Sequence, residues 1–355
     1  MQVTFPPSGT SQTWPASYHP GMKLKNSITD VPGIEVGHAQ NDEALTGCTV
    51  ILCRKGAVAG VDVRGGAPGT RETDLLNPIN LVQKVHAVML AGGSAYGLDA
   101  ASGAMRYLEE NKIGFYTGVA RVPIVPSAIL YDLSLGRADV RPDAGMGYAA
   151  CLSASNAKVT EGNVGAGTGA SVGKIFGQRQ AMKSGIGSAS ISIGNGLIIG
   201  ALAAVNAFGD VVDPETGSIV AGVRSARSGR FQLGAPGYFA DTMQVMKSFL
   251  GRTALGFATY ANTMLGVIAV NASLNKTEMT KVAQMAQDGL ARSIRPAHTM
   301  LDGDTVFALA TGGKKADVST VGAYAAEALA LAIVRAARMS TSAAGLPGLN
   351  KDTSS

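Results

Sequence analysis

The sequence predicts an α/β protein in which strands and helices pack in layers. Hydrophobic residues make up 46% of the 355 residues and charged residues only 15%, so a large part of the chain is expected to be buried. Short apolar runs rich in β-branched residues alternate with alanine-rich stretches of helical periodicity. This alternation favours an α/β fold, although it does not choose among the possible layerings of sheets and helices.

Composition and charge argue against several classes of function. The net charge is only +5 and aromatic residues make up 5%, with no run of Lys or Arg, so nucleic acid is not expected as a partner. The cysteines, Cys48, Cys53 and Cys151, are odd in number and form no Cys-x-x-Cys pair. We expect reduced core thiols in a cytoplasmic protein, with Cys48 and Cys53 on opposite faces of a strand because their separation is odd. The four histidines show no metal-ligand spacing, so no metal is expected.

The two ends of the chain are predicted to be irregular. Residues 1–21 contain four prolines among serines and threonines and have neither the basic start nor the apolar core of a signal peptide. We expect them to form a flexible extension, and residues 340–355 to be a frayed tail. The longest apolar run, around 196–205, is only half of the about 20 residues that a membrane helix needs, so no membrane partner is expected.

In the first part of the chain, residues 34–63 hold three apolar runs that suggest a β-meander. Residues 85–90 form a buried strand that leads through a Gly-Gly-Ser-x-x-Gly turn into a helix. That turn lacks the Gly-x-Gly-x-x-Gly order of dinucleotide sites, and we interpret it as a tight strand-to-helix turn. The following loop, 122–132, offers Ser127, Tyr131 and Asp132 as polar groups.

The glycine-rich segment 162–174 has the composition of a phosphate-binding loop without its order. A P-loop needs Ser or Thr after its lysine, whereas Ile175 follows Lys174. Gly165-x-Gly167-x-x-Ala170 matches the dinucleotide pattern, yet the polar residues before it show no strand. No nucleotide cofactor is therefore expected. The segment is either an irregular loop or a loop that delivers Lys174 into a pocket.

The later strands place polar residues where a site could form. Residues 196–206 form a buried strand that ends at Asn206, and 225–257 are expected to be a surface linker. Asn262 and Thr263 directly precede the apolar run 265–270, and Asp302 and Asp304 precede another at 305–310. A hydroxyl and two carboxylates at neighbouring strand starts can meet at one end of a sheet, as a nucleophile beside acid–base partners. Asn-Thr and Asp-Gly-Asp are also common in simple turns.

Two helices are predicted in the C-terminal part. Asn275 and Glu278 form a capping-box pattern, followed by an apolar face made of Met279, Val282, Ala283, Ala286 and Leu290. Residues 320–339 are apolar nearly all round, which predicts a buried helix.

The segment Ser-Ile-Arg-Pro-Ala-His-Thr-Met-Leu-Asp-Gly-Asp-Thr-Val-Phe-Ala, 293–308, resembles the P1 (S58) peptidase family, most closely its nylon-oligomer hydrolases. L-aminopeptidase/D-esterases and β-peptidyl aminopeptidases belong to the same family. The resemblance covers roughly 22–339 and implies a single catalytic domain. It also implies a four-layer α-β-β-α sandwich of the N-terminal nucleophile (Ntn) hydrolase type, like that of L-aminopeptidase/D-esterase and ornithine acetyltransferase.

Members of this family are made as one chain that cuts itself before a Ser or Thr, which then becomes an N-terminal nucleophile. The matching bond is Asn262–Thr263, so we expect fragments 1–262 and 263–355 that remain together. An α-amino group has a pKa of about 7.7–8.0, so cleavage would create a base next to the Thr263 hydroxyl. The β-branch of Thr263 also restricts χ1.

The resemblance assigns the remaining roles. It implies that Asn206, with Tyr131, holds the oxyanion, that Asp302 and Asp304 orient the new ammonium and relay protons, and that Lys174 is their charge partner. It further implies a homo-oligomer, a tetramer of cleaved units. A Thr–His–Asp arrangement through His298 is a rival mechanism.

Three functions follow as alternatives. The first is an amidohydrolase of the nylon-oligomer or aminopeptidase kind, for which we favour 6-aminohexanoate oligomers because the nucleophile is Thr and the carboxylate loop is Asp-Gly-Asp. The second is an ornithine acetyltransferase-like acyltransferase, whose Lys-Gly-Ala-Thr type of cut site is absent here. The third is a non-catalytic binding protein that would remain uncut.

Overall fold

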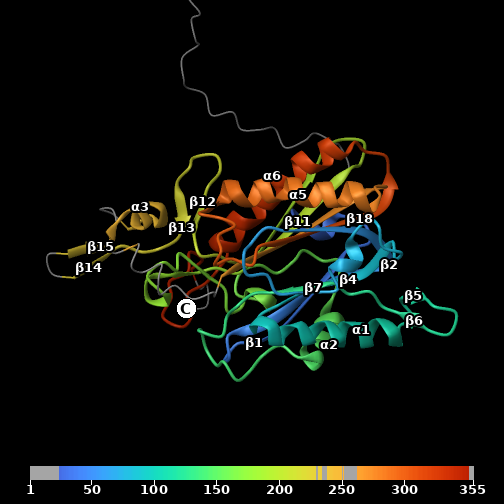
Figure 1. Ribbon diagram of the computed structural model, residues 1–355, viewed down its shortest axis with the longest axis horizontal. Helices are drawn as coiled ribbons and strands as arrows, with labels where there is room; N and C mark the ends of the chain where they lie inside the picture. Colours follow the sequence, from blue (N-terminus) through green and yellow to red (C-terminus); the bar gives the residue numbers. More distant parts are fainter. Residues whose placement is uncertain (1–23, 229–230, 234–237, 250, 252–261, 352–355) are drawn as a thin grey trace, which may run out of the picture.

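The computed structural model describes residues 24–228, 231–233, 238–249, 251 and 262–351. The extension predicted for 1–21 and part of the linker predicted for 225–257 lie outside the described residues. Within the described part of that linker, a hairpin and a short helix occur: β14 (Ala226–Ser228), β15 (Phe231–Leu233) and α3 (Thr242–Lys247). They lie beside the main body of the protein (Figure 1).

Half of the described strands join one nine-stranded sheet. Its strands are β1 (Glu35–Asn41), β2 (Thr46–Val63), β3 (Thr70–Arg71), β4 (Lys84–Ala91), β7 (Ser127–Ile129), β10 (Ile186–Ser192), β11 (Ile198–Asn206), β16 (Thr263–Ala272) and β18 (Thr305–Lys314). The order is β10-β11-β16-β18-β2-β4-β7-β3, with β1 also paired to β2. The first part of β2 pairs with β1 and β4 and its last part pairs with β18. One long strand thus connects two layers of sheet.

Short pairings complete the strands: β5 (Phe115–Tyr116) with β6 (Arg121–Val122), β8 (Ser171–Val172) with β9 (Met182–Lys183), and β12 (Asp210–Val212) with β13 (Ile219–Ala221) and β17 (Ile294–Arg295). The helices of the body are α1 (Ala100–Glu110), α2 (Ala144–Ser153), α5 (Lys276–Ser293) and α6 (Val318–Arg338). Figure 1 shows α5 and α6 on one side of the strands and α1 and α2 on the other.

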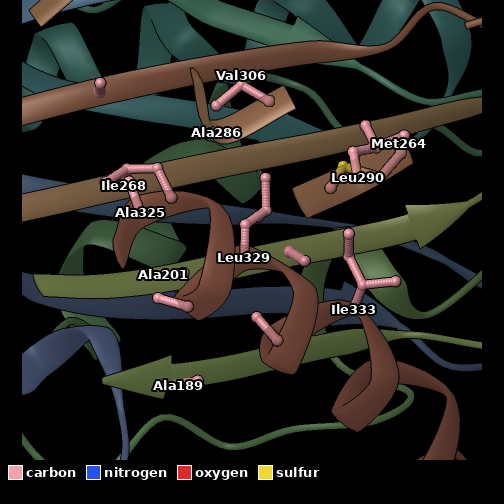
Figure 2. Packing of buried hydrophobic residues seen from close by; sticks show 14 of the residues in the cluster. Ala189, Ala201, Met264, Ile268, Ala286, Leu290, Val306, Ala325, Leu329 and Ile333 are labelled. Atoms are coloured by element: carbon pink, nitrogen blue, oxygen red, sulfur yellow. The ribbon is translucent and has the colours of Figure 1, made fainter. Parts of the chain in front are cut away.

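Alternation of side chains along the strands builds three apolar cores between four layers. On β16, Met264 and Ile268 face α5 and α6, while Leu265 and Val267 face the second layer of sheet. Figure 2 shows the first of these cores, where Leu329 and Ile333 of α6 pack on the strands. A third core lies between β2, β4 and the helices α1 and α2. The predicted four-layer α-β-β-α sandwich is confirmed, with both central layers hydrogen-bonded into one sheet.

The β-meander predicted for 34–63 is wrong. The segment contains two strands, and its second and third apolar runs form the single strand β2 of 18 residues. A register shift between Leu52 and Ala57, with Gly56 at a φ of 75°, lets this strand bend instead of ending. Cys48 and Cys53 do face different cores, as predicted.

The C-terminal elements agree with the sequence except at the tail. Asn275 and Glu278 form the predicted capping box of α5. Helix α6 is long and apolar enough to cross a membrane by length and composition, but core helices pass the same test and most of α6 is buried. The frayed tail predicted from 340 onward is wrong for the described residues 340–351. Ser340 is fully buried there, and Leu346 packs against Leu135 and Ala181.

Candidate active site

Three polar strand ends meet at one end of the sheet. Strands β16 and β18 are parallel neighbours, with Leu265 beside Thr305, so their first residues lie at the same end. Strand β11 runs antiparallel to β16 and ends there too, which places Asn206 opposite Thr263. The predicted nucleophile, amide and carboxylate loop are thereby brought together, and all of these polar side chains are buried.

The carbonyl of the peptide group before Thr263 accepts hydrogen bonds from two donors. Asn262 forms a parallel β-bridge with Asp302, and the N–H of Gly303 donates to the Asn262 carbonyl at 3.0 Å. The Thr263 hydroxyl donates to the same carbonyl oxygen. A Cβ on Gly303 would lie 2.8 Å from Thr263 Oγ1 and 2.6 Å from the Ala67 carbonyl oxygen, so this close approach requires glycine.

Asp304 is the carboxylate that contacts the start of β16. Its Oδ1 accepts the N–H of Met264 at 2.9 Å, directly after Thr263 in the chain. Its Oδ2 accepts both the backbone N–H and the ring Nδ1 of His298, each at 3.0 Å. These three donors fix the carboxylate next to the residue that would carry the new amino group.

Asp302 is held in a separate set of hydrogen bonds. Its Oδ2 accepts the hydroxyl of Thr299 at 2.5 Å and the Thr299 N–H at 3.1 Å, and its Oδ1 accepts the N–H of Phe208 at 3.3 Å. Burial, and then the charge of Asp304, raise the pKa of the Asp302 carboxyl above its usual range. The two carboxylates of the loop therefore have separate sets of donors, and burial acts on Asp302.

Asn206 and Lys174 form one hydrogen-bonded unit. Lys174 Nζ donates to Asn206 Oδ1 at 2.8 Å and to its carbonyl at 2.9 Å, and the Ser171 N–H donates to Oδ1 at 3.1 Å. Burial lowers the pKa of Lys174 to about 7, while the charges of Asp302 and Asp132 oppose that decrease. The glycine-rich segment therefore delivers Lys174 to a buried polar site, the second of the two interpretations of its sequence.

Tyr131 and His298 are placed differently from the other candidates. Tyr131 contacts Asn206 through its backbone carbonyl, which accepts from Asn206 Nδ2 at 2.8 Å. His298 binds Asp304, but no hydrogen bond joins His298 to Thr263 among the residues that the structure describes. Of the contacts that the rival Thr–His–Asp mechanism needs, the structure contains the one between His298 and Asp304. The mechanism itself stays a prediction.

The sequence did not reveal the loop that supports the carboxylates. The N–H groups of Arg64 and Gly65 donate to the Asp304 carbonyl at 3.0 and 3.3 Å, and the Ala67 N–H donates to the Asp302 carbonyl at 2.9 Å. A Cβ on Gly65 would lie 2.2 Å from the Asp302 carbonyl oxygen. The only signal in the sequence was the adjacent glycines, which indicate a tight turn without naming its partner.

Two cavities of the structure lie away from this polar cluster. Cavities of about 360 and 420 Å³ are lined by residues such as Lys55, Thr311 and Gly312, at the opposite end of β16 and β18. Within the described part of the chain, no group of three or more His, Cys, Asp or Glu side chains is placed to hold a metal ion. The polar cluster, rather than either cavity, has the groups that catalysis requires.

Residues 26–350 match the family model for Peptidase family S58. The chain belongs to peptidase family S58. It is 46% identical over 346 residues to an uncharacterized aminopeptidase of Mycobacterium tuberculosis (strain ATCC 25618 / H37Rv), covering 91% of this chain and 96% of that one. It is 33% identical over 325 residues to a 6-aminohexanoate-oligomer endohydrolase of Kocuria sp. (strain KY2), covering 87% and 85% of the two chains.

Two solved structures share the fold of this S58 protein. A Burkholderia sp. beta-aminopeptidase matches with a TM-score of 0.65 and 24% identity over 92% of this chain and 91% of that one. The L-aminopeptidase D-Ala-esterase/amidase of Ochrobactrum anthropi, a variant of the Ntn hydrolase fold, matches with a TM-score of 0.66 and 19% identity over 91% and 88%. The family and Ntn-type fold implied by the sequence are confirmed, and the S58 protein is an amide-bond hydrolase of the amidase or aminopeptidase class.

Proposed function

We propose that this S58 protein is a self-processing N-terminal threonine amidohydrolase. It cuts its own Asn262–Thr263 bond and then hydrolyses amide bonds within short linear oligoamides such as 6-aminohexanoate oligomers. The observation that carries the proposal is the contact of the Thr263 hydroxyl with the Asn262 carbonyl, which the Gly303 N–H also holds.

In the first reaction Thr263 Oγ attacks the Asn262 carbonyl carbon. The Oγ–C bond forms, the C–N bond breaks, and the hydroxyl proton ends on the Thr263 nitrogen, giving an ester. The Gly303 N–H, 3.0 Å from the carbonyl oxygen, stabilises the negative charge that develops there. Water then opens the ester, which restores the hydroxyl and leaves Asn262 as a carboxylate.

In the second reaction the free amino group of Thr263 is the base. Its pKa of about 7.7–8.0 leaves it partly neutral at working pH, so it takes the hydroxyl proton as Oγ attacks the substrate amide. Asn206 stabilises the oxyanion in this reaction, as it also does in the self-cleavage, with Tyr131 beside it. Asp304 and Asp302 orient the Thr263 amine and relay protons, and Lys174 tunes them through its charge.

Three features support an endo-acting oligoamide hydrolase. The Kocuria relative is named for that activity, and the Asp302-Gly-Asp304 loop resembles the nylon-oligomer branch. An aminopeptidase needs a carboxylate for the free ammonium of its substrate, whereas both carboxylates near Thr263 are bound to internal donors. The second candidate, an aminopeptidase, is favoured by the name of the 46% identical relative.

Intact mass spectrometry under denaturing conditions tests the processing. An active sample should contain fragments 1–262 and 263–355, which remain associated in native conditions because β16 lies between β11 and β18. A single full-length species in an active sample would contradict self-cleavage. Native mass spectrometry of the same sample tests the proposed homo-oligomer, a tetramer of cleaved units.

A panel of three substrates tests the specificity: a linear 6-aminohexanoate oligomer, its N-acetylated form, and an amino-acid p-nitroanilide. Cleavage of the blocked oligomer at internal bonds supports the proposed substrate. Activity restricted to free-amine substrates, one residue at a time, assigns the enzyme to the aminopeptidase branch instead.

A further inference from the structure

Lys183 is a buried cation outside the set of reacting groups. It has no exposed surface and is one of the largest fully buried side chains among the described residues. Its strand, β9, pairs with β8, so that Lys183 lies opposite Ser171. Its Nζ donates to the carbonyl oxygens of Thr168 and Ala170, each at 2.8 Å. The ammonium therefore closes the turn that precedes β8.

Burying an ammonium costs several kcal/mol unless partners offset the loss of water. The opposite charge here is Asp132, itself buried and fixed by the Thr46 hydroxyl and the Gly93 N–H, each at 2.7 Å. Burial lowers the pKa of Lys183 to about 7, and the charge of Asp132 opposes that decrease. Both the ammonium and the neutral amine carry at least two hydrogens, so both forms can hold the two carbonyls.

The closed turn leads directly to Asn206. The Ser171 N–H, next in the chain after Ala170, donates to Asn206 Oδ1, and Lys174 Nζ donates to the same atom. A backbone N–H and an ammonium can only donate, so the atom that they share must be the amide oxygen. The amide nitrogen is thereby directed toward the Tyr131 carbonyl, 2.8 Å away. The position of the turn therefore decides whether the oxygen or the nitrogen of the Asn206 side-chain amide faces the Tyr131 carbonyl.

The C-terminal segment holds the other side of Lys183. The Pro347 carbonyl accepts the Lys183 N–H at 3.0 Å, and Leu346 packs against Ala181, two residues before Lys183. This contact explains why residues after 340 are packed rather than frayed. A segment on the far side of the proposed cut thus supports β9.

We propose that Lys183 is a positioning residue for Asn206. By clamping Thr168 and Ala170 it fixes the Ser171 N–H and so orients the side-chain amide. The inference rests on the proposed function, in which Asn206 donates to the oxyanion. Lys183 touches no reacting atom, and its effect passes entirely through the turn.

The first test compares Lys183→Met with Lys276→Met. Lys276 is a matched control, because it is also buried and its Nζ donates to three loop carbonyls, those of Leu75, Asn80 and Val82. Lys183→Met should lower kcat per cleaved enzyme by roughly 10- to 100-fold with KM nearly unchanged, because a displaced donor loses transition-state stabilisation. Lys276→Met should leave kcat within about twofold of wild type, since its Nζ binds the loop carbonyls at 75–82 rather than the turn that leads to Asn206. Equal kcat in wild type and Lys183→Met would overturn the inference.

The second test repeats Lys183→Met in an Asn206→Ala background. If Lys183 acts through Asn206, the second substitution should lower kcat little further, whereas a general structural role would multiply the two losses. Multiplied losses overturn the inference. An Asn206→Ala enzyme with normal kcat would instead overturn the oxyanion role in the proposed function. If Lys183→Met fails to fold, Lys183→Gln, which keeps a shorter donor, enters the same cycle and should give a smaller loss of kcat.

Discussion

The two ends of strands β16 and β18 have opposite characters. At their starting end, Thr263, Asp302 and Asp304 are buried and bound to internal partners. At their far end, Gly312 and Gly313 of β18 have φ values of 87° and 109° where its register with β16 shifts, and Lys55 and Lys314 line an open cavity of about 360 Å³. The candidate catalytic groups lie at the starting end, whereas the two cavities lie at the far end. In the uncut chain, the Asn262 carbonyl already occupies the position where an acyl group would react.

The difference follows from the direction of the strands. Parallel neighbours start at the same end, so both loops that enter the strands can contribute side chains to one buried cluster. The far ends only need to turn back into solvent, which small and charged residues do well. The two cavities therefore lie at the end of the sheet opposite the polar cluster.

The largest expected effect is at the nucleophile. Thr263→Ala should leave the chain uncut and lower kcat/KM by roughly 10⁴-fold or more, because both reactions use the same Oγ. Thr263→Ser should cut and keep part of the activity. The matched change at the far end, Thr311→Ala, should leave processing and turnover normal, since Thr311 lines the cavity there.

Denaturing mass spectrometry and steady-state rates measure both results. A Thr263→Ala chain that is still cut between Asn262 and Thr263 would show that another group cleaves this bond. The proposed chemical difference between the two ends of β16 and β18 would then be wrong.

Removing the carboxylate beside the nucleophile strand should have the next largest effect. Asp304→Ala should slow self-cleavage and turnover by roughly 10²- to 10³-fold, because both need a proton relay. His298→Ala should have a smaller effect, since the Met264 and His298 backbone N–H groups would still hold Asp304. Single-turnover rates on both variants, with circular dichroism to check folding, provide the measurement. Normal turnover in Asp304→Ala with an inactive His298→Ala would favour the triad through His298.

The two reactions should also differ in their dependence on pH. Turnover uses the Thr263 amine, whose neutral fraction falls about tenfold for each pH unit below a pKa of about 7.7–8.0. The rate kcat/KM should therefore rise from pH 6 to pH 8. Self-cleavage takes place before that amine exists and should lack this rise. Newly translated chain followed by mass spectrometry gives the second profile, and identical profiles would argue against the amine as the base.

The smallest expected effect is that of Asn275→Ala, which forms a matched pair with Asn206→Ala. Asn275 begins α5 and lines the cavity of about 420 Å³ at the far end, where its side chain accepts the Glu278 N–H. Asn275→Ala should lower the free energy of unfolding by about 1 kcal/mol through loss of the cap, with normal processing and turnover. Asn206→Ala, at the near end, should slow both reactions by on the order of a hundredfold. Thermal unfolding and rate measurements on the pair separate a structural asparagine from a functional one.

The sequence alone determined the elements and their polar ends. Continuous apolar runs marked β16 and β18, the capping box marked the start of α5, and the positions of Thr263, Asp302 and Asp304 before the strands predicted a shared site. These features depend on residues close together in the chain, which is why local patterns reveal them. The resemblance of 293–308 to a known family added the four layers and the cut site that we propose.

Only the tertiary structure decided how distant segments serve that site. The Gly303 N–H on the Asn262 carbonyl depends on the register of two strands that start about forty residues apart. The Lys183 clamp depends on β9 pairing with β8 and on the C-terminal segment reaching Lys183. The bend in the single strand β2 depends on its pairing with β4 in one layer of sheet and with β18 in the other. Hydrogen bonds between residues far apart in sequence have no local periodicity, so the folded chain alone specifies them.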